Sequence, residues 1–347
     1  MIKYKKNSFK MKNIAISVVV PVYGVERYIE RCVRSLFSQT MTEGVEFIFV
    51  NDGTKDRSIE LLTALISEYP YLSSQIKIIN HLRNRGLAAA RQTGLAAACG
   101  EYILHLDSDD YFEPDMLELM YEAALAKNAD VVVSDFFMTF KKGDEYKECP
   151  IYETKEAILK SIIAPSRYGN KTIGPSVWNK LTKRSIYTRH SINPIEGINH
   201  GEDLIIAMQI LYYADVITKV DRAFVHYNKQ NPGSYTQNKS ASITLQRLRA
   251  TEIVADFLSE KGAVFDEEFN ERRFIEKLIG IANCDQAELQ EFLLMYPWLD
   301  YEKHKYLVAP YWRLPYKFAL QGKTRMFVFL RNLMYPIRKI YRFIYNL

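Results

Sequence analysis

Residues 14–54 read IAISVVVPVYGVERYIERCVRSLFSQTMTEGVEFIFVNDGT, and this stretch decides the fold. Two apolar runs rich in β-branched residues, at 14–20 and 45–50, have the length and composition of buried strands. Between them, residues 25–39 space their apolar side chains at helical intervals. A strand, a helix and a second buried strand in this order predict a right-handed βαβ unit with parallel strands.

The same alternation continues to about residue 135. Further buried strands are expected at 75–80, 102–106 and 130–134. Further helices are expected at 57–69, 86–99 and 114–128. Because parallel strands are joined by helical crossovers, the sequence predicts an α/β fold with a mostly parallel sheet.

Beyond about residue 140 the alternation weakens. A helix is expected at 201–214, and residues 240–295 have mostly helical spacing, with interruptions at Gly262 and Asn283. Three prolines, Pro310, Pro315 and Pro336, are expected to break the final stretch. We therefore expect a larger α/β domain at 12–235 and a smaller, mostly helical C-terminal region at 240–347.

The composition is that of a folded protein. Of the 347 residues, 48% are hydrophobic and 25% charged, which excludes disordered, collagen-like and coiled-coil proteins. No apolar run reaches the roughly 18–20 residues of a membrane-spanning helix, and the basic N-terminus lacks the apolar stretch of a secretion signal. The four cysteines are scattered, with no pair at metal-ligand or redox spacing. These features predict a protein of the reducing cytosol.

The positive charge is concentrated at the C-terminus. Residues 303–347 contain ten Lys or Arg and no Asp or Glu, whereas the first 302 residues carry 36 basic and 41 acidic side chains. After Leu330, apolar residues recur at helical spacing, and they are Leu333, Met334, Ile337, Tyr341 and Ile344. Basic residues fall on another face of the same helix, and they are Arg331, Arg338 and Arg342. The pattern predicts an amphipathic helix at about 325–347, kinked at Pro336, that lies on an anionic membrane at the inner face of the cytoplasmic membrane. The alternative is that the stripe packs on the rest of the protein or on a second subunit. Nucleic acid is disfavoured as a partner, because the acidic body would oppose it.

Polar or turn residues follow four successive strands, in the segments 21–24, 51–54, 81–86 and 107–110. In open parallel sheets, ligands bind beyond the carboxyl ends of the strands. The four segments therefore predict one binding site assembled at a single rim of the sheet.

The segment Asp107-Ser108-Asp109-Asp110 places three carboxylates within four residues. Carboxylates spaced as Asp-x-Asp after an apolar strand can offer hard oxygen ligands to Mg²⁺ or Mn²⁺. A metal bound in this way keeps coordination positions open for a diphosphate. The alternative is that they cap the helix expected near Pro114. Together with the other strand-end segments, the pattern favours a metal.

A second acidic pair, Glu202-Asp203, opens the helix expected at 201–214. Acidic side chains at a helix N-terminus are ordinary partners of the helix dipole. A carboxylate held there can also act as a general base. The chain has no Gly-x-Gly-x-x-Gly segment and no phosphate-binding loop, which disfavours dinucleotide dehydrogenases and P-loop kinases.

These segments, in their order, resemble the family-2 glycosyltransferases, which are inverting enzymes with the Rossmann-like GT-A fold. The resemblance runs from Ile16 to about Tyr213 and rests on ordered blocks: Val20–Tyr23, Val50–Thr54 with Asp56, Asn84–Arg91, Gly100–Ile103, Leu106–Asp110, Trp178–Leu181 and Gly201–Asp203. It implies that residues 12–235 bind a nucleotide sugar, most simply a UDP-sugar, and that the activity is of the hexosyltransferase type. The acceptor expected for this family is a hydroxyl of a glycan or lipid-linked glycan in surface-polysaccharide assembly.

The resemblance also implies roles for individual residues. The nucleotide site would consist of the backbone at Pro21, Val22 and Tyr23, of Asp52 as acceptor from a uracil-type imide, and of Arg91, Asp107 and Ser108. Asp109 would be the principal ligand of Mn²⁺ or Mg²⁺, with Asp107 beside it. Asp203 would be the catalytic base with Glu202 next to it, and Trp178 and Lys180 would line the sugar or acceptor side. Gly24, Thr54 and Gln92 depart from residues common in the family, but no carboxylate is missing.

Two other functions use similar features. A sugar-nucleotide nucleotidyltransferase also needs acidic metal ligands at a sheet rim, but its Gly-rich basic N-terminal loop is absent here. A non-catalytic sugar-binding protein on the same fold would not need both Asp109 and Asp203. Two histidines stay open in role: His105 lies inside a strand pattern, which favours the core, and His226 could approach the diphosphate or be structural.

Overall fold

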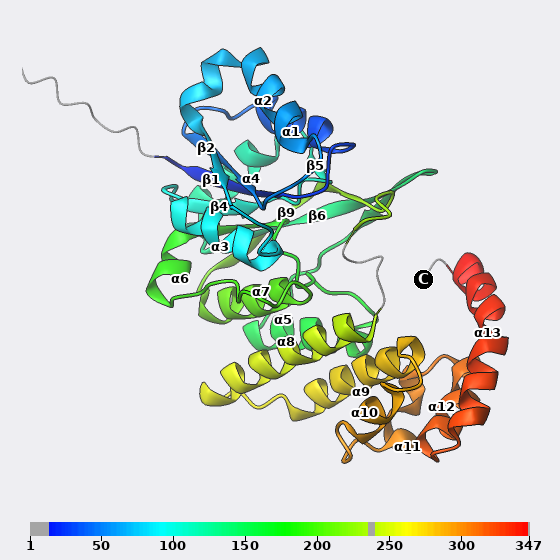
Figure 1. The fold of residues 1–347 in the computed structure, drawn as a ribbon. Coiled ribbons are helices and arrows are strands. Elements are labelled where there is room, and N and C mark those ends of the chain that lie inside the picture. The colour runs from blue at the N-terminus through cyan, green and yellow to red at the C-terminus, as the bar shows by residue number, and fades with distance from the viewer. Residues whose placement is uncertain (1–13, 235–239, 346–347) are drawn as a thin grey trace, which may run out of the picture. The chain divides into compact units, whose positions relative to one another are not determined.

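The structure is a computed structural model that describes residues 14–234 and 240–345 (Figure 1). It divides into two compact units. The first consists of the described residues up to 159 together with 171–233, and the second of 160–170 together with the described residues from 234 on. The segment 160–170 thus groups with the C-terminal helices, although the sequence-based division placed it in the first domain.

The described part of the first unit contains one nine-stranded sheet, in the order β3-β2-β1-β4-β8-β6-β9-β5, with β7 paired to β6. The strands β1 (Ile16–Val22), β2 (Val45–Asn51), β3 (Ile76–Asn80) and β4 (Tyr102–His105) are parallel, as the sequence predicts. The other half is mixed. In it, β8 (Lys180–Lys183) is antiparallel to β4 and β6 (Val131–Phe140), and β9 (Ile217–Asn228) is parallel to β6. The short strands β5 (Tyr111–Phe112) and β7 (Gly143–Lys147) add antiparallel edges.

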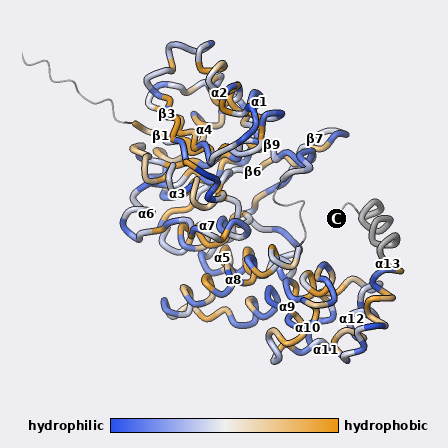
Figure 2. The backbone as a smooth tube through the Cα atoms, in the orientation of Figure 1, coloured by the Kyte–Doolittle hydropathy of each residue, from blue (hydrophilic) through white to orange (hydrophobic). Residues whose placement is uncertain are grey.

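The two faces of the parallel half are covered by different helices (Figure 1). Alternate residues of β1, such as Val18 and Val20, pack in one core with α1 (Ile29–Phe37), α2 (Ser58–Glu68) and α4 (Met116–Lys127). The opposite face of the sheet packs against α3 (Leu87–Ala97). A Cβ added at Gly94 of α3 would lie 2.3 Å from Cγ1 of Val19, so this helix approaches the sheet as closely as a glycine allows. Figure 2 shows the apolar strands as the most hydrophobic part of this unit.

The remaining α-helices of the first unit lie between strands of the sheet's mixed half in chain order. They are α5 (Lys155–Ile163), α6 (Arg184–Arg189) and α7 (Glu202–Tyr213), of which α5 runs across the division into the second unit. The observed α7 agrees with the helix expected at 201–214, and its Ncap residue Gly201 has φ 96°. Glu202 and Asp203 therefore lie in the first turn of α7, where the sequence places them.

The second unit is helical in its described part, with α8 (Ala241–Glu260), α9 (Asp266–Asn283), α10 (Leu289–Leu294), α11 (Tyr301–His304), α12 (Pro310–Leu320) and α13 (Thr324–Tyr345). The predicted interruptions are confirmed: Gly262 lies in the turn after α8 with φ 76°, and Asn283 ends α9. The core of this unit includes Phe292, Trp312 and Phe327.

The prediction that three prolines break the final stretch is wrong for two of them. Pro310 begins α12, where its missing N–H group is not needed. Pro315 lies inside α12 and Pro336 inside α13, so neither ends a helix. No helix in the described residues is both long and apolar enough to cross a membrane.

Candidate active site

The segments that follow β2 and β3 are held together by Asp52, which is 2% exposed. Its Oδ1 accepts hydrogen bonds from the backbone N–H of Arg85 (2.9 Å) and pairs with Nδ1 of His81 (2.7 Å). Its Oδ2 accepts from the backbone N–H of Gly86 (2.8 Å). Asp52 therefore fixes the segment that leads into α3, in addition to any contact that it makes with a ligand.

The segments after β1 and β2 are tied together by Asp56, to which the sequence interpretation gave no role. Its carboxylate accepts hydrogen bonds from the N–H of Glu26 and from the hydroxyls of Thr54 and Ser58. Hydrogen bonding lowers the pKa of Asp56 below its ordinary value, although burial opposes the shift. The Thr54 hydroxyl in turn accepts from the N–H of Gly24 (2.9 Å). Asp56 thus shapes the rim by joining these two segments.

The residues expected to hold a nucleotide base differ in accessibility. Val22 is buried, and its carbonyl accepts a hydrogen bond from the N–H of Asp52 (3.0 Å). Pro21 is buried beside it, whereas the ring of Tyr23 is 47% exposed. Ser108 is buried in the turn between Asp107 and Asp110. Of these residues, Tyr23 has the surface that is open to a ligand.

The two acidic segments meet on one side chain, Arg91 of α3. Its Nη2 donates to Oδ1 of Asp107 (2.5 Å) and its Nη1 to Oε1 of Glu202 (2.5 Å). Asp107 follows Arg91 by 16 residues and Glu202 follows it by 111 residues. Arg91 is 2% exposed and Glu202 is 4% exposed, whereas the Asp107 side chain is 26% exposed, so this ion-pair triad is buried on the Glu202 side and reaches the surface at Asp107.

Buried charges in the triad shift one another's pKa. Burial would lower the pKa of Arg91, but the carboxylates of Asp107 and Glu202 hold it above its ordinary value. Burial raises the pKa of Glu202, the Arg91 guanidinium opposes this rise, and the charges of Asp203 and Asp107 add to it. Because one cation faces three carboxylates, it does not offset all of their mutual repulsion. The pKa of Glu202 therefore stays above its ordinary value in spite of the guanidinium.

A second group surrounds Asp109 and Asp110. Oδ2 of Asp109 accepts a hydrogen bond from Nδ2 of Asn231 (2.8 Å), and Oδ1 of Asp110 accepts one from the N–H of Asn228 (2.7 Å). Burial and the neighbouring Asp107 raise the pKa of Asp109 above its ordinary value. The sequence analysis assigned no role to either asparagine. A signal existed for Asn228, which directly follows the mostly apolar run 223–227 and ends β9, a strand that the sequence analysis did not predict.

The donor set fits a divalent cation in part. Asp107 and Asp109 offer hard oxygen ligands, and Oδ2 of the buried Asp110 has no hydrogen-bond partner among the described residues. Within residues 14–234 and 240–345, no group of three or more His, Cys, Asp or Glu side chains is arranged to hold a metal ion. Two carboxylates suffice for Mg²⁺ or Mn²⁺ only where phosphate and water supply the other ligands. A divalent cation at this site would therefore need phosphate and water as its further ligands.

Trp178 and Lys180, expected on the sugar or acceptor side, lie in the protein interior. Trp178 is 8% exposed and stacks on Tyr227, with ring centroids 5.6 Å apart. Nζ of Lys180 donates to the carbonyls of Ile173, Gly174 and Ser176, at 2.7–3.0 Å. Burial lowers the pKa of Lys180 to about 8. In this conformation Lys180 supports the segment 173–176, and a contact with a sugar stays a prediction.

Both histidines that were left open in role are packed inside the first unit. His226 stacks between Tyr111 and Phe137, and its Nε2 pairs with Glu113 at 2.7 Å. His105 lies in β4 and is 1% exposed, as its strand pattern predicts. Burial, together with the charge of Arg91, lowers the pKa of His105 to about 3. The neutral imidazole of His105 thus sits beneath the triad.

An α/β sheet of this topology, with acidic residues gathered at one rim, is the GT-A architecture of glycosyltransferases. The profile described as glycosyl transferase family 2 matches residues 17–191, about half of the chain. The chain is 32% identical over 252 residues to the putative glycosyltransferase EpsH of Bacillus subtilis, which covers 72% of this chain and 71% of that protein. It therefore belongs to glycosyl transferase family 2, and it is a glycosyltransferase.

Other comparisons agree with this assignment. The chain is 28% identical over 261 residues to the cholesterol galactosyltransferase of Borreliella burgdorferi, covering 73% of this chain and 69% of that protein. Its fold matches the crystal structure of S. aureus TarS 1-349 with a TM-score of 0.62 at 19% identity, over 92% of this chain and 90% of that TarS 1-349 chain. The structure of TarS in complex with UDP-GlcNAc matches equally, with a TM-score of 0.62 at 18% identity and the same coverage. The family match ends at residue 191, so Glu202, Asp203, Asn228 and Asn231 lie beyond it.

Proposed function

We propose that this protein transfers a sugar from a nucleotide-sugar donor, most simply a UDP-sugar, to a hydroxyl of a glycan or lipid-linked glycan, with inversion at the anomeric carbon. The observation that carries the proposal is the meeting of Asp107 and Glu202 on the guanidinium of Arg91. It brings the expected metal side and the expected base side of the reaction to one place. The likeness to a TarS structure with bound UDP-GlcNAc supports the nucleotide-sugar class.

The nucleotide base would lie at the ends of β1 and β2. A carboxylate has about four acceptor positions, and Asp52 uses three of them within the protein. The remaining position can accept the imide N–H of a uracil, and the half-exposed ring of Tyr23 can cover the base. Asp52 would then fix the base and the start of α3 in one arrangement.

The transfer is a single displacement. The carboxylate of Asp203 takes the proton of the acceptor hydroxyl as that oxygen bonds to the anomeric carbon, and the nucleoside diphosphate leaves from the opposite face. Glu202, held by Arg91, keeps the first turn of α7 in place beside the reacting atoms. Asp107 and Asp109 would hold Mn²⁺ or Mg²⁺, which would offset the charge that develops on the diphosphate. Catalysis then consists of positioning and electrostatic stabilisation.

The test is a screen of nucleotide sugars for hydrolysis in the presence and absence of Mn²⁺, followed by acceptor trials with the best donor. Release of a nucleoside diphosphate supports the proposal. Release of pyrophosphate from a nucleoside triphosphate and a sugar phosphate would instead show a nucleotidyltransferase. Binding of a sugar without turnover of any donor would show a non-catalytic protein.

A lipid-linked acceptor fits the surface of the second unit, and we propose peripheral contact with an anionic membrane there. On α13, Met326, Phe329 and Leu333 recur at helical spacing and are 46–63% exposed, whereas Phe327 is buried in the core. On α12, Leu314 is 55% exposed and lies beside basic residues. We call these four residues, with the exposed Arg313, Lys317, Lys323 and Arg325, the α12–α13 surface.

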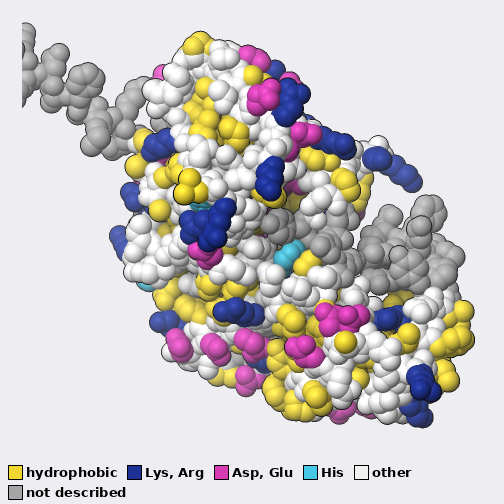
Figure 3. Space-filling view, viewed as in Figure 1, with side chains coloured by type: hydrophobic (Ala, Val, Ile, Leu, Met, Phe, Trp, Pro, Cys, Tyr) yellow, Lys and Arg dark blue, Asp and Glu magenta, His cyan; other side chains and the backbone are white. Residues whose placement is uncertain are grey.

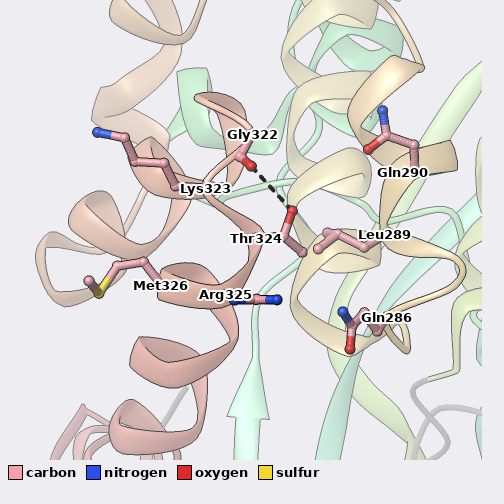
Figure 4. A pocket seen from close by; sticks show the side chains of 8 residues that line it. All are labelled: Gln286, Leu289, Gln290, Gly322, Lys323, Thr324, Arg325 and Met326. Atoms are coloured by element: carbon pink, nitrogen blue, oxygen red, sulfur yellow. Dashed lines mark hydrogen bonds between the residues drawn. The ribbon is translucent and has the colours of Figure 1, made fainter.

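The charge and shape of this surface support a lipid partner. On the face drawn in Figure 3, apolar and basic side chains lie together around α12 and α13. An open pocket of about 730 Å³ lies where α13 begins; Lys323, Arg325 and Met326 line it together with Gln286, Leu289 and Gln290 from α10 and the preceding turn (Figure 4). Arg331 of the expected basic face points inward, since it donates to the carbonyl of Cys284 (2.8 Å). The side chains of Ile337, Arg338, Tyr341, Arg342 and Ile344 lie outside the described residues.

Sedimentation with vesicles of anionic phospholipid tests the membrane contact. We expect the full chain to sediment at low salt, and a chain truncated after Gln321 to stay in the supernatant. Replacing Phe329 and Leu333 by Ser should reduce sedimentation, whereas Val264→Ser, at a residue 70% exposed elsewhere in the second unit, should not. If the full chain stays in the supernatant, the apolar residues of this surface serve protein packing instead.

A further inference from the structure

Arg91 has no free Nη group to offer a nucleotide. It is 2% exposed, and both of its Nη groups are taken by carboxylates at 2.5 Å. Its Nε is buried without a hydrogen-bond partner in the described structure. A ribose hydroxyl or a phosphate would have to displace Asp107 or Glu202 to reach the guanidinium. The resemblance places this arginine near the ribose or phosphates, whereas its two Nη groups donate to carboxylates of the protein.

Contacts hold α3, the helix that carries Arg91, at its N-terminus and again one turn after Arg91. One turn after Arg91, Gly94 lies against Val19 with no room for a Cβ atom. At its start, Asp52 accepts the N–H of Gly86, and Oδ1 of Asn199 accepts the N–H of Ala88 (3.1 Å). A Cβ at Gly86 would lie 2.4 Å from the Asn199 amide. The segment before α7 therefore rests directly on α3, through Asn199 as well as through the triad.

From these contacts we propose that Arg91 is a positioning residue for the proposed reaction and does not contact the donor. It sets the separation between Asp107, on the metal side, and the first turn of α7, which carries Asp203. The planar guanidinium suits this function, because its two Nη groups point in fixed directions toward two acceptors. Since all three participants are held on a rigid helix, strand end and helix start, the geometry exists before a donor binds. The proposal rests on the proposed function, and concerns how its two halves are held together.

The first test replaces Arg91 by Lys, which keeps the charge but has a single donor atom. For a positioning residue, kcat for the donor found in the screen should fall by roughly 10²-fold or more, while the Kd of UDP in Mn²⁺, measured by calorimetry, changes by less than about 3-fold. Arg57→Lys is the matched control, because Arg57 is 67% exposed and pairs with Glu60 on the surface; both quantities should stay within about 2-fold of the native values. A UDP Kd raised about 10-fold or more with unchanged kcat would mean that Arg91 contacts the nucleotide. Unchanged kcat and Kd would mean that the bridge has no part in the reaction. Either result overturns the proposal.

The second test keeps the proposal falsifiable if Arg91→Lys does not fold. Glu202→Gln removes one carboxyl partner of Arg91, so the guanidinium pairs more strongly with Asp107 and competes with a cation for that carboxylate. The Mn²⁺ concentration that half-saturates UDP binding should then rise by about 3-fold or more, although Glu202 is not an expected metal ligand. In a protein that already carries Arg91→Lys, adding Glu202→Gln should raise this half-saturating Mn²⁺ concentration by a smaller factor. An Mn²⁺ requirement equal to that of the native protein would refute the coupling.

Failure of the proposed function has a different signature. If the native protein binds no UDP and turns over no nucleotide sugar, the proposed function is wrong. Suppose instead that the native protein binds UDP and turns over a nucleotide sugar, while kcat of Arg91→Lys and the Mn²⁺ requirement of Glu202→Gln equal the native values. In that case only the role of Arg91 is wrong. Circular dichroism of each variant distinguishes both cases from loss of the fold.

Discussion

Replacement of Glu46 by Gln should destabilise the first unit far more than its isosteric nature suggests. Glu46 lies in β2 and is 2% exposed. Its Oε1 accepts from the Ser17 hydroxyl (2.6 Å) and from the N–H of Cys99 (2.6 Å), and its Oε2 accepts from Nζ of Lys77 (2.7 Å). One carboxylate thus links β1, β2, β3 and the turn before β4.

The magnitude follows from these three contacts. A hydrogen bond to a charged group stabilises by about 1.5–3 kcal/mol, against about 1 kcal/mol for a neutral pair, so the two bonds at Oε1 lose roughly 1–4 kcal/mol in the variant. The Lys77 side chain is 44% exposed, so solvent screens its pair, which adds no more than about 1 kcal/mol. The amide N–H₂ of a glutamine would also face the Lys77 ammonium. We expect a loss of about 1–5 kcal/mol near pH 7.

The loss should depend on pH in one direction. Burial opposes ionisation of Glu46, but the hydrogen bonds from Lys77, Ser17 and Cys99 lower its pKa below the ordinary value. A carboxyl whose folded-state pKa is depressed contributes stability above its unfolded-state pKa of about 4.3, and that contribution is lost as the pH falls through the folded-state pKa. The difference in stability between the native protein and the variant should therefore be constant from about pH 6 to 8, and shrink below about pH 4.3.

Urea unfolding followed by circular dichroism at several pH values measures this difference. Hydrogen exchange at the Cys99 amide reports the same bond locally, and its protection should fall in the variant. Glu60→Gln is the control, because Glu60 is 65% exposed and pairs only with Arg57 on the same helix face; its stability should equal that of the native protein. A Glu46→Gln variant as stable as the native protein at pH 7, or a difference that persists undiminished in acid, would refute the reasoning.

Three further predictions concern the site. Asp109→Asn keeps its shape toward Asn231 but loses its charge, so Mn²⁺-dependent turnover should fall by roughly 10²-fold or more while circular dichroism is unchanged; full turnover in chelator would contradict the metal assignment. Asp203→Asn should lower kcat by roughly 10²-fold or more with UDP affinity retained, and Glu202→Gln should lower it less; the reverse order in a kinetic comparison would make Glu202 the base. Gly94→Ala should destabilise by about 1–3 kcal/mol in urea unfolding, because the new Cβ meets Val19, despite alanine's advantage of about 1 kcal/mol in a helix; a gain in stability would show that α3 can move.

The parallel half of the sheet could be predicted from the sequence because each of its strands is a continuous apolar run. Val18, Val20, Phe47 and Phe49 are fully buried, and such strands carry a strong local signal. The mixed half could not be predicted, because β8 has four residues, which include Lys180 and Lys183, and its pairing depends on distant partners. Local patterns give no information on such pairings.

The candidate site shows the same division. The clustering of Asp52, Asp107 and Asp109 at one rim could be predicted, since parallel strands place their carboxyl ends together. That Arg91 faces two carboxylates could not be predicted, because direction and burial of a side chain follow from packing. Likewise, Lys180 matches a family block in the sequence, but its ammonium is enclosed by backbone carbonyls. Residue type indicates which chemistry is available, and packing decides which groups a substrate can reach.

The partners of Asp109 and Asp110 have a consequence for biosynthesis of the chain. Asn228 and Asn231 follow Asp109 by 119 and 122 residues, at and beyond the end of β9. A ribosome therefore releases β1–β4 and their helices long before the strand that completes the acidic rim, and contacts so distant in sequence form late. We expect a nascent chain arrested at residue 191, which includes all of the family match, to bind no UDP, whereas one that exposes residue 234 does. Synthesis from the N-terminus would thus leave the incomplete chain unable to bind UDP until all of its first unit has left the ribosome.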